Sequence, residues 1–120
     1  MHWKDLDVWK KSHELVLKVY EISKRFPKNE TYAITDQIRR AATSIPANIV
    51  EGQSRNTTKE YLQFLYNARG SLEEVRYFLL LSKDLGYLDD TIFQSLEGDA
   101  GTLSRMLNRL IKSLVGKVVT

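Results

Sequence analysis

The stretch DQIRRAATSIPANIVEG, residues 36–52, decides the fold, because it has the pattern of an amphipathic helix with a proline inside it. An apolar stripe recurs at steps of four, three, four and four residues and keeps its phase past Pro46: Ile34, Ile38, Ala41, Ile45 and Ile49. Pro46 donates no backbone hydrogen bond and its ring crowds the Ala42 carbonyl, which costs roughly 3 kcal/mol. We therefore expect a helix that kinks at Pro46 but continues, with Ser44 and Asn48 placed to offset the loss.

Three further stretches show helical periodicity, and short loops separate all four. The predicted helices cover about residues 5–26, 30–54, 58–86 and 90–115. Amphipathic helices joined by short loops lie antiparallel and bury their apolar stripes together. The sequence therefore predicts an all-α protein, a single antiparallel up-down-up-down four-helix bundle over residues 1–120, with its second helix kinked at Pro46.

The composition narrows the class of protein. The 120 residues suit one domain, and the absence of cysteine excludes disulfides and cysteine metal sites and suits a reducing cytoplasm. Residues 1–5 contain no apolar signal core, and the apolar run 77–81 is far too short to cross a bilayer. We therefore expect a soluble, cytoplasmic protein with no membrane partner. The net charge of +3 permits nucleic acid as a partner without demanding it.

The apolar run at residues 77–81 also predicts association. Successive helical residues advance by about 100°, so five apolar neighbours sweep around the helix and some of them must face outward. A contiguous patch of aromatic and leucine side chains usually marks a contact surface. We therefore expect an oligomer whose candidate interface is Tyr77, Phe78, Leu80 and Leu81. The alternative is that the neighbouring loop covers these side chains.

Two basic stripes are candidate nucleic-acid contacts. Arg69, Arg76 and Lys83 repeat every seven residues on the third predicted helix, and Arg105, Arg109 and Lys112 form a stripe on the fourth. Residues 101–120 contain four basic groups and no acid. Such an array favours binding of RNA or DNA that is sensitive to salt and largely independent of sequence. The alternative is an ordinary solvated face, since Glu73 lies close to Arg69 and Arg76.

The kinked segment carries a second group of charges. Asp36, Arg39 and Arg40, together with Glu51 and Glu74, predict an ion-pair network between the second and third helices or across subunits. The alternative is ordinary surface pairing. Gly70 costs about 1 kcal/mol in mid-helix, a penalty explained if another backbone approaches it closely.

Enzymatic function is the weakest interpretation. The two histidines are His2, in the expected N-terminal tail, and His13, whose helical spacing favours a packed or interface role. The chain has no Glu-x-x-His pair for a di-iron site and no phosphate-binding glycine loop. The sequence therefore predicts no catalytic residues, no cofactor and no metal.

The motifs resemble one bacterial family. The matching residues are Asp36, Gln37, Arg39, Arg40, Ser44, Pro46, Asn48, Glu51, Gly52, Gly70, Ser71 and Glu74. They resemble the four-helix bundle proteins encoded by intervening sequences in 23S ribosomal RNA genes, and the stand-alone relatives of those proteins. This resemblance implies a ring-shaped homopentamer and a distant kinship to the basic, nucleic-acid-binding accessory protein of diversity-generating retroelements. It implies no enzymatic activity.

Together these observations predict a non-enzymatic, oligomeric helical bundle. The first partner to test, besides further copies of the chain, is nucleic acid, with RNA foremost. The alternative is a purely structural or protein–protein interaction module.

Overall fold

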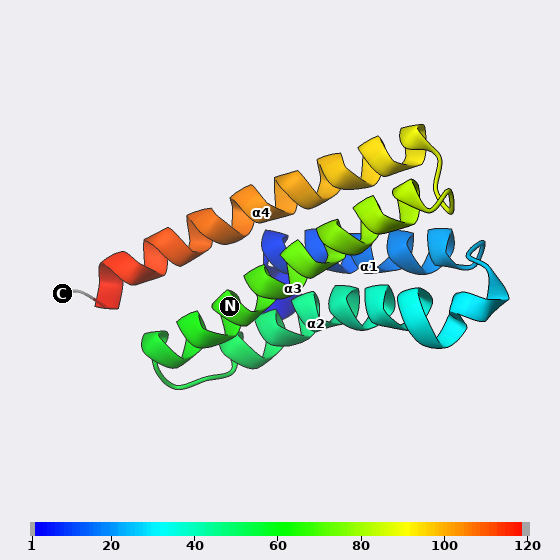
Figure 1. Cartoon of the computed structure of the whole chain (residues 1–120). Helices are drawn as coiled ribbons and strands as arrows, with labels where there is room; N and C mark the ends of the chain where they lie inside the picture. The colour runs from blue at the N-terminus through cyan, green and yellow to red at the C-terminus, as the bar shows by residue number, and fades with distance from the viewer. Residues whose placement is uncertain (1, 119–120) are drawn as a thin grey trace.

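Four α-helices make up most of the computed structural model, which describes residues 2–118. They are α1 (Asp7–Ser23), α2 (Asp36–Gln53), α3 (Thr58–Asp84) and α4 (Asp90–Val118). The α1–α2 and α3–α4 connections lie at one end of the bundle and the α2–α3 turn lies at the other, so consecutive helices run antiparallel (Figure 1). Residues 2–118 contain no strand. The predicted all-α four-helix bundle is confirmed.

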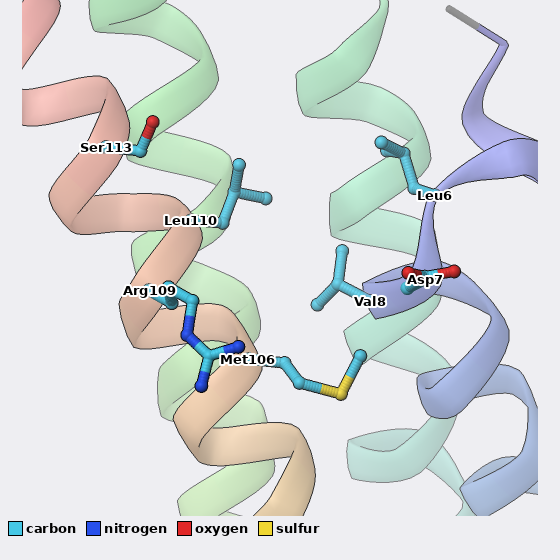
Figure 2. A pocket seen from close by; sticks show the side chains of 7 residues that line it. All are labelled: Leu6, Asp7, Val8, Met106, Arg109, Leu110 and Ser113. Carbon is cyan, nitrogen blue, oxygen red and sulfur yellow. The ribbon is translucent and has the colours of Figure 1, made fainter.

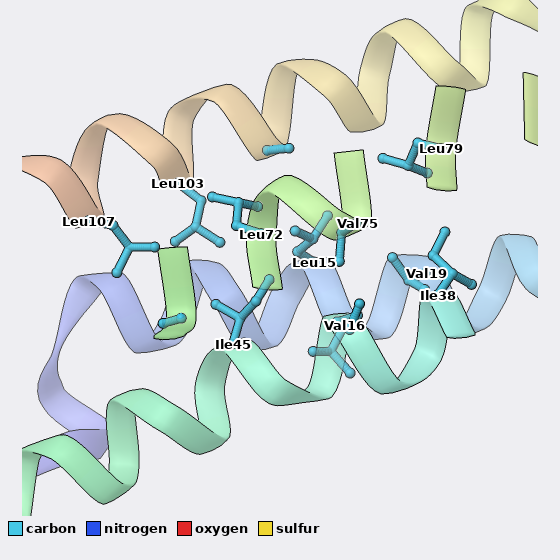
Figure 3. Packing of buried hydrophobic residues seen from close by; sticks show 14 of the residues in the cluster. Leu15, Val16, Val19, Ile38, Ile45, Leu72, Val75, Leu79, Leu103 and Leu107 are labelled. Carbon is cyan, nitrogen blue, oxygen red and sulfur yellow. The ribbon is translucent and has the colours of Figure 1, made fainter. Parts of the chain in front are cut away.

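The helices bury their apolar stripes in one shared core. Helix α1 packs against α2 and α4, and so does α3. Helices α1 and α3 therefore lie diagonally opposite each other in the bundle. Figure 3 shows side chains of all four helices meeting in the centre. Fully buried members of the core are Leu15, Val19, Ile38, Ile45, Ile49, Leu65, Leu72, Val75, Leu79, Leu103 and Leu107. All five residues of the apolar stripe predicted around Pro46, from Ile34 to Ile49, are buried.

Two predicted helix boundaries need correction. The first helix ends at Ser23 rather than residue 26, because the amides of Arg25 and Phe26 bond three residues back, to Ile22 and Ser23. Phe26 is still buried in this tighter turn, which explains why the apolar spacing continued beyond the helix. The predicted helix 30–54 is three elements: the 3₁₀ turn η2 (Lys28–Glu30), the π-helical segment η3 (Thr31–Thr35) and α2. The backbone of η3 breaks at Ala33, where φ is −122° and ψ is −107°.

The ends of the third and fourth helices differ less from the prediction. Helix α3 ends at Asp84, and Gly86 takes a φ of 82° while the Tyr87 amide donates to the Ser82 carbonyl. A glycine with positive φ just after a helix is a common C-terminal stop, and it lies at the end of the predicted range 58–86. Helix α4 continues through Gly116 to Val118, three residues beyond the predicted end.

Helix α2 runs through Pro46 without interruption. Asn48 Nδ2 donates to the Ser44 carbonyl at 2.7 Å and to Ser44 Oγ at 3.0 Å. The carbonyl that Pro46 deprives of its amide partner is that of Ala42, so the predicted compensation by Ser44 and Asn48 stays a prediction. Ser44 Oγ also lies 2.8 Å from Ser71 Oγ, which joins α2 to α3. The kink angle at Pro46 stays a prediction.

A carboxylate of α4 fastens α1 to the bundle. Asp99 accepts hydrogen bonds from Lys18 at 2.7 Å and from Lys11 at 3.2 Å. Burial on its own raises the pKa of Asp99, but the hydrogen bonds from Lys18 and Lys11 outweigh it and hold the pKa below its ordinary value. The same contact, together with Glu14, raises the pKa of Lys18.

We expect Asp99→Asn to lower the free energy of unfolding at pH 7 by about 1 kcal/mol. Because the pKa of Asp99 is lowered in the folded protein, the folded protein binds a proton at the Asp99 carboxylate more weakly than the unfolded chain does. The stabilisation is therefore complete above the ordinary carboxyl pKa of about 3.9 and is lost as the pH falls through the lower folded value. Urea titrations from pH 7 down to pH 3 should show a smaller loss of stability in the variant.

The matched control is Glu21→Gln, which breaks the exposed pair between Glu21 and Lys24. This variant should keep the pH dependence of the wild type. An acid dependence that is the same in Asp99→Asn and in the wild type would contradict the role of Asp99.

Candidate nucleic-acid interface

The three cations of α4 form an exposed stripe. Arg105, Arg109 and Lys112 are all exposed, and none of them has a carboxylate partner within the described part of the chain. Arg105 donates a hydrogen bond to the neutral Thr102 hydroxyl at 3.2 Å. Since residues 101–118 contain no acid, this half of α4 offers nothing that compensates the charge of the stripe.

The cations of α3 are mostly compensated. Arg76 donates from Nε to Glu97 at 2.9 Å and from Nη1 to Glu73 at 3.1 Å, and the hydrogen bond to Glu97 is the main cause of its raised pKa. Lys83 lies 4.0 Å from Asp90 and 4.7 Å from the centre of the Phe93 ring. The partners Glu97 and Asp90 come from α4, so the antiparallel register of the two helices neutralises these charges.

Arg69 differs from its neighbours on α3. Its Nη1 donates to Asn108 Oδ1 of α4 at 3.2 Å, and its guanidinium lies 5.1 Å from the Tyr66 ring. Both partners are neutral, and Arg69 is exposed. The contact with Asn108 places Arg69 beside the stripe of α4. The six predicted cations therefore divide into two groups, with Arg69, Arg105, Arg109 and Lys112 uncompensated and Arg76 and Lys83 paired.

Charge is segregated along the bundle. The end that holds the α2–α3 turn comprises residues 2–12, 46–70 and 103–118, where ten lysines and arginines face four acids (Figure 1). The other end comprises residues 13–45 and 71–102, where eight cations face eleven acids. We call the first region the basic end. Because distant segments contribute to it, no single sequence window reveals this polarity.

A shallow groove runs between α1 and α4 within the basic end. Its volume is about 310 Å³, and Leu6, Asp7, Val8, Met106, Arg109, Leu110 and Ser113 line it. Figure 2 shows the apolar side chains between the two helices, with Arg109 on the α4 side and Asp7 on the α1 side. The sequence pattern did not predict this groove, because its two walls lie about one hundred residues apart.

The expected ion-pair network between α2 and α3 is not formed within the subunit. Asp36 pairs with Arg40 at 2.8 Å, one turn along α2, and Glu51 pairs with Arg55 at 2.9 Å. These are ordinary surface pairs, which was the alternative interpretation. Glu74 is exposed and has no hydrogen bond or ion pair in the region from residue 2 to residue 118.

The remaining motif residues of α2 differ in what they contact. Arg39 reaches α1, where its Nε donates to Ser23 Oγ at 2.8 Å and its guanidinium lies 4.7 Å from the Tyr20 ring. Gln37 is exposed on α2. A hydrogen bond between the Ser44 and Ser71 hydroxyls ties α2 to α3.

The glycine at the close helix approach is Gly52, not Gly70. A Cβ atom at Gly70 would meet nothing within 4 Å among residues 2–118, so the expectation of a close backbone at Gly70 is wrong within the chain. A Cβ at Gly52 would lie 2.8 Å from Tyr61 Cδ1 and 2.9 Å from Phe64 Cβ. Gly52 is therefore the position where α2 and α3 come together.

The predicted apolar interface is half exposed. Tyr77 and Leu80 are 57% and 42% exposed. Phe78 and Leu81 are partly buried against the core, so their side chains already have partners in the chain. No neighbouring loop covers Tyr77 or Leu80 in the described structure. This outcome leaves Tyr77 and Leu80 as the outward part of the predicted patch.

Residues 2–118 contain neither a metal site nor a membrane-spanning helix. No group of three histidine or acidic side chains between residues 2 and 118 is placed to hold a metal ion. No helix in that range is both long and apolar enough to span a bilayer. His13 is exposed and stacks on Trp9, with ring centres 5.1 Å apart.

Comparisons with known proteins agree with this architecture. A family model described as 23S rRNA-intervening sequence protein matches residues 4–109. A crystal structure from Bacteroides thetaiotaomicron VPI-5482, described as a protein with unknown function from the S23 ribosomal protein family, is similar to this chain. The two are 27% identical and superpose with a TM-score of 0.80, covering 88% of this chain and 98% of that chain. No curated protein matches the sequence.

Proposed function

Since the chain belongs to the family of 23S rRNA-intervening sequence proteins, we propose that it is a non-enzymatic, self-associating helical bundle that binds nucleic acid through its basic end. The family model confirms the resemblance that the sequence motifs indicated. Because the function of this family is unknown, the proposal is based on the surface of this chain. RNA is the first partner to test.

The observation that carries the proposal is the uncompensated stripe Arg105, Arg109 and Lys112. The first and last of these residues are seven residues apart on one helix, about 10 Å at 1.5 Å per residue, which suits contact with successive phosphates along a backbone. Arg69 extends the stripe towards α3 through its contact with Asn108. Exposed arginine and lysine side chains without acidic partners can neutralise phosphates, which releases the counterions that had condensed on the nucleic acid.

Self-association strengthens this binding. Each further copy adds another basic end, and several weak phosphate contacts on one assembly act together as a multivalent surface. Residues 101–118 of α4, which carry the stripe, contain no aromatic side chain on which bases could stack, so binding through the stripe should depend on charge far more than on base sequence.

The test is a salt titration of binding to labelled single-stranded RNA, duplex RNA and duplex DNA, followed by fluorescence anisotropy. We expect binding of all three probes and a linear fall of log affinity with log salt. Light scattering on the same samples gives the mass of the assembly. Failure to bind any probe near physiological salt would reject the nucleic-acid part and favour a structural or protein-interaction module.

A further inference from the structure

The groove between α1 and α4 shares one residue with the basic stripe. Arg109 is the middle cation of the stripe and also lines the groove, where it lies on the α4 side and Asp7 lies on the α1 side (Figure 2). We propose that this groove receives one unpaired guanine base of a single-stranded RNA whose phosphates follow the stripe. This inference rests on the nucleic-acid binding in the proposed function, and it adds a base preference that phosphate contacts alone do not supply.

Most of the groove is lined by apolar side chains. They are Leu6 and Val8 of α1 and Met106 and Leu110 of α4, and they lie between the two helices (Figure 2). Such a surface suits the flat face of a nucleobase, and the thioether of Met106 makes favourable contacts with aromatic rings. The volume of about 310 Å³ is at the lower end of the range for ligand sites, about 300–1,000 Å³. The groove therefore suits a single base.

The two charged residues of the groove are both without a partner. Asp7 is exposed, and its carboxylate accepts no hydrogen bond and forms no ion pair within residues 2–118. Arg109 has no carboxylate partner there either, so the two side chains do not pair with each other across the groove. A ligand that bridges them offers a negative group to Arg109 and hydrogen-bond donors to Asp7. A nucleotide has both, in its phosphate and in the edge of its base.

The carboxylate of Asp7 favours guanine over the other bases. A carboxylate has two acceptor oxygens and no donor. Guanine presents two adjacent donors on its Watson–Crick edge, N1–H and the N2 amino group, whereas adenine, cytosine and uracil each place an acceptor next to a donor there. Without such donors, Asp7 would repel the phosphates that the stripe attracts.

The proposed contact also requires an unpaired base. In a duplex the Watson–Crick edge is occupied by the opposite strand, whereas proteins commonly read this edge on the splayed bases of single-stranded RNA. Duplex RNA and DNA should therefore bind to the stripe alone and leave the groove empty.

The experiment compares single-stranded RNA probes that differ in one base. Each probe is a labelled oligouridine with guanosine, adenosine, inosine or 7-deazaguanosine at its centre, and binding is followed by fluorescence anisotropy at one salt concentration. We expect the guanosine probe to bind at least about 5-fold more tightly than the adenosine probe, which is the lower limit for a bidentate contact to a base. Inosine lacks the N2 amino group and should lose most of this preference.

The 7-deazaguanosine probe distinguishes Asp7 from the neighbouring arginines. Arginine commonly reads guanine through O6 and N7, on the edge opposite to the N1–H and N2 donors. The 7-deaza base lacks N7 but keeps both donors, so it should bind as tightly as guanosine. Loss of the preference with this probe would show that an arginine reads the base, and it would overturn the role of Asp7.

Asp7→Asn tests the carboxylate, and Asp5→Asn is its matched control. Both variants lose one negative charge, and Asp5 is also exposed but does not line the groove. Asp7→Asn should bind the guanosine and adenosine probes equally, whereas Asp5→Asn should keep the wild-type preference. Because an acid in the first turn of α1 also favours the start of that helix, thermal melts verify that each variant folds. Binding to duplex DNA should not fall in either variant.

The outcomes are distinct. Failure to bind any probe would overturn the proposed function and the guanine site together. Salt-dependent binding that does not distinguish guanosine from adenosine would overturn only the guanine site and leave the groove to another occupant. An unchanged preference in folded Asp7→Asn, or an equal loss of preference in Asp5→Asn, would also overturn it.

Discussion

Replacing Arg105, Arg109 and Lys112 with glutamate is expected to abolish nucleic-acid binding at physiological salt. Removing three phosphate contacts lowers the slope of log affinity against log salt by about 3, and it weakens binding by roughly 100-fold or more. The three side chains are exposed and have no carboxylate partner within residues 2–118, so their replacement breaks no ion pair of the described fold. The measurement is a salt titration with labelled RNA and DNA.

A matched variant tests whether position or total charge matters. The control variant replaces three cations of the other half of the bundle with glutamine: Lys28, Arg76 and Lys83. It is compared with a variant that has glutamine at Arg105, Arg109 and Lys112. Both triple variants lose the same formal charge. The α4 variant should lose most of the salt slope, while the control should change it by less than about 1. Equal losses in the two variants would show that binding follows net charge and would reject the basic end as the site.

Gly52→Ala is expected to destabilise the bundle by about 1–3 kcal/mol, an unusually large effect for the addition of one methyl group. The added Cβ would lie under 3.0 Å from both Tyr61 Cδ1 and Phe64 Cβ. The Tyr61 ring can rotate away, but Phe64 Cβ is attached directly to the α3 backbone, so relief requires the two helices to separate. Chemical denaturation measures the change in the free energy of unfolding.

Gly98→Ala is the control for Gly52→Ala. Gly98 is an exposed residue of α4, and a Cβ there would meet nothing within 4 Å among the described residues. Alanine should therefore stabilise α4 by up to about 1 kcal/mol through helix propensity. If Gly52→Ala also stabilised the protein, the close α2–α3 approach at Gly52 would not hold in solution.

The candidate site was only partly predictable. Periodicity identified all six basic residues of the two stripes, because a repeat of three, four or seven residues places side chains on one face of a helix. Periodicity did not show that Arg76 is paired with an acid whereas Arg105 is not. Arg76 is neutralised by Glu97, a residue 21 positions away on α4. This pairing depends on how far α3 and α4 slide past each other, and local spacing carries no information on that register.

The amino-acid sequence by itself determined the four helices, their apolar faces and the antiparallel order, since these follow from side-chain period and short loops. Only the tertiary structure decided which charges are paired, which glycine lies at a close approach and which apolar residues stay exposed. Gly52 and Gly70 are both mid-sequence helical glycines, yet one meets Tyr61 and the other meets nothing within its own chain. The physical reason is that rotation and register of packed helices are set by the whole core at once, whereas periodicity describes one helix at a time.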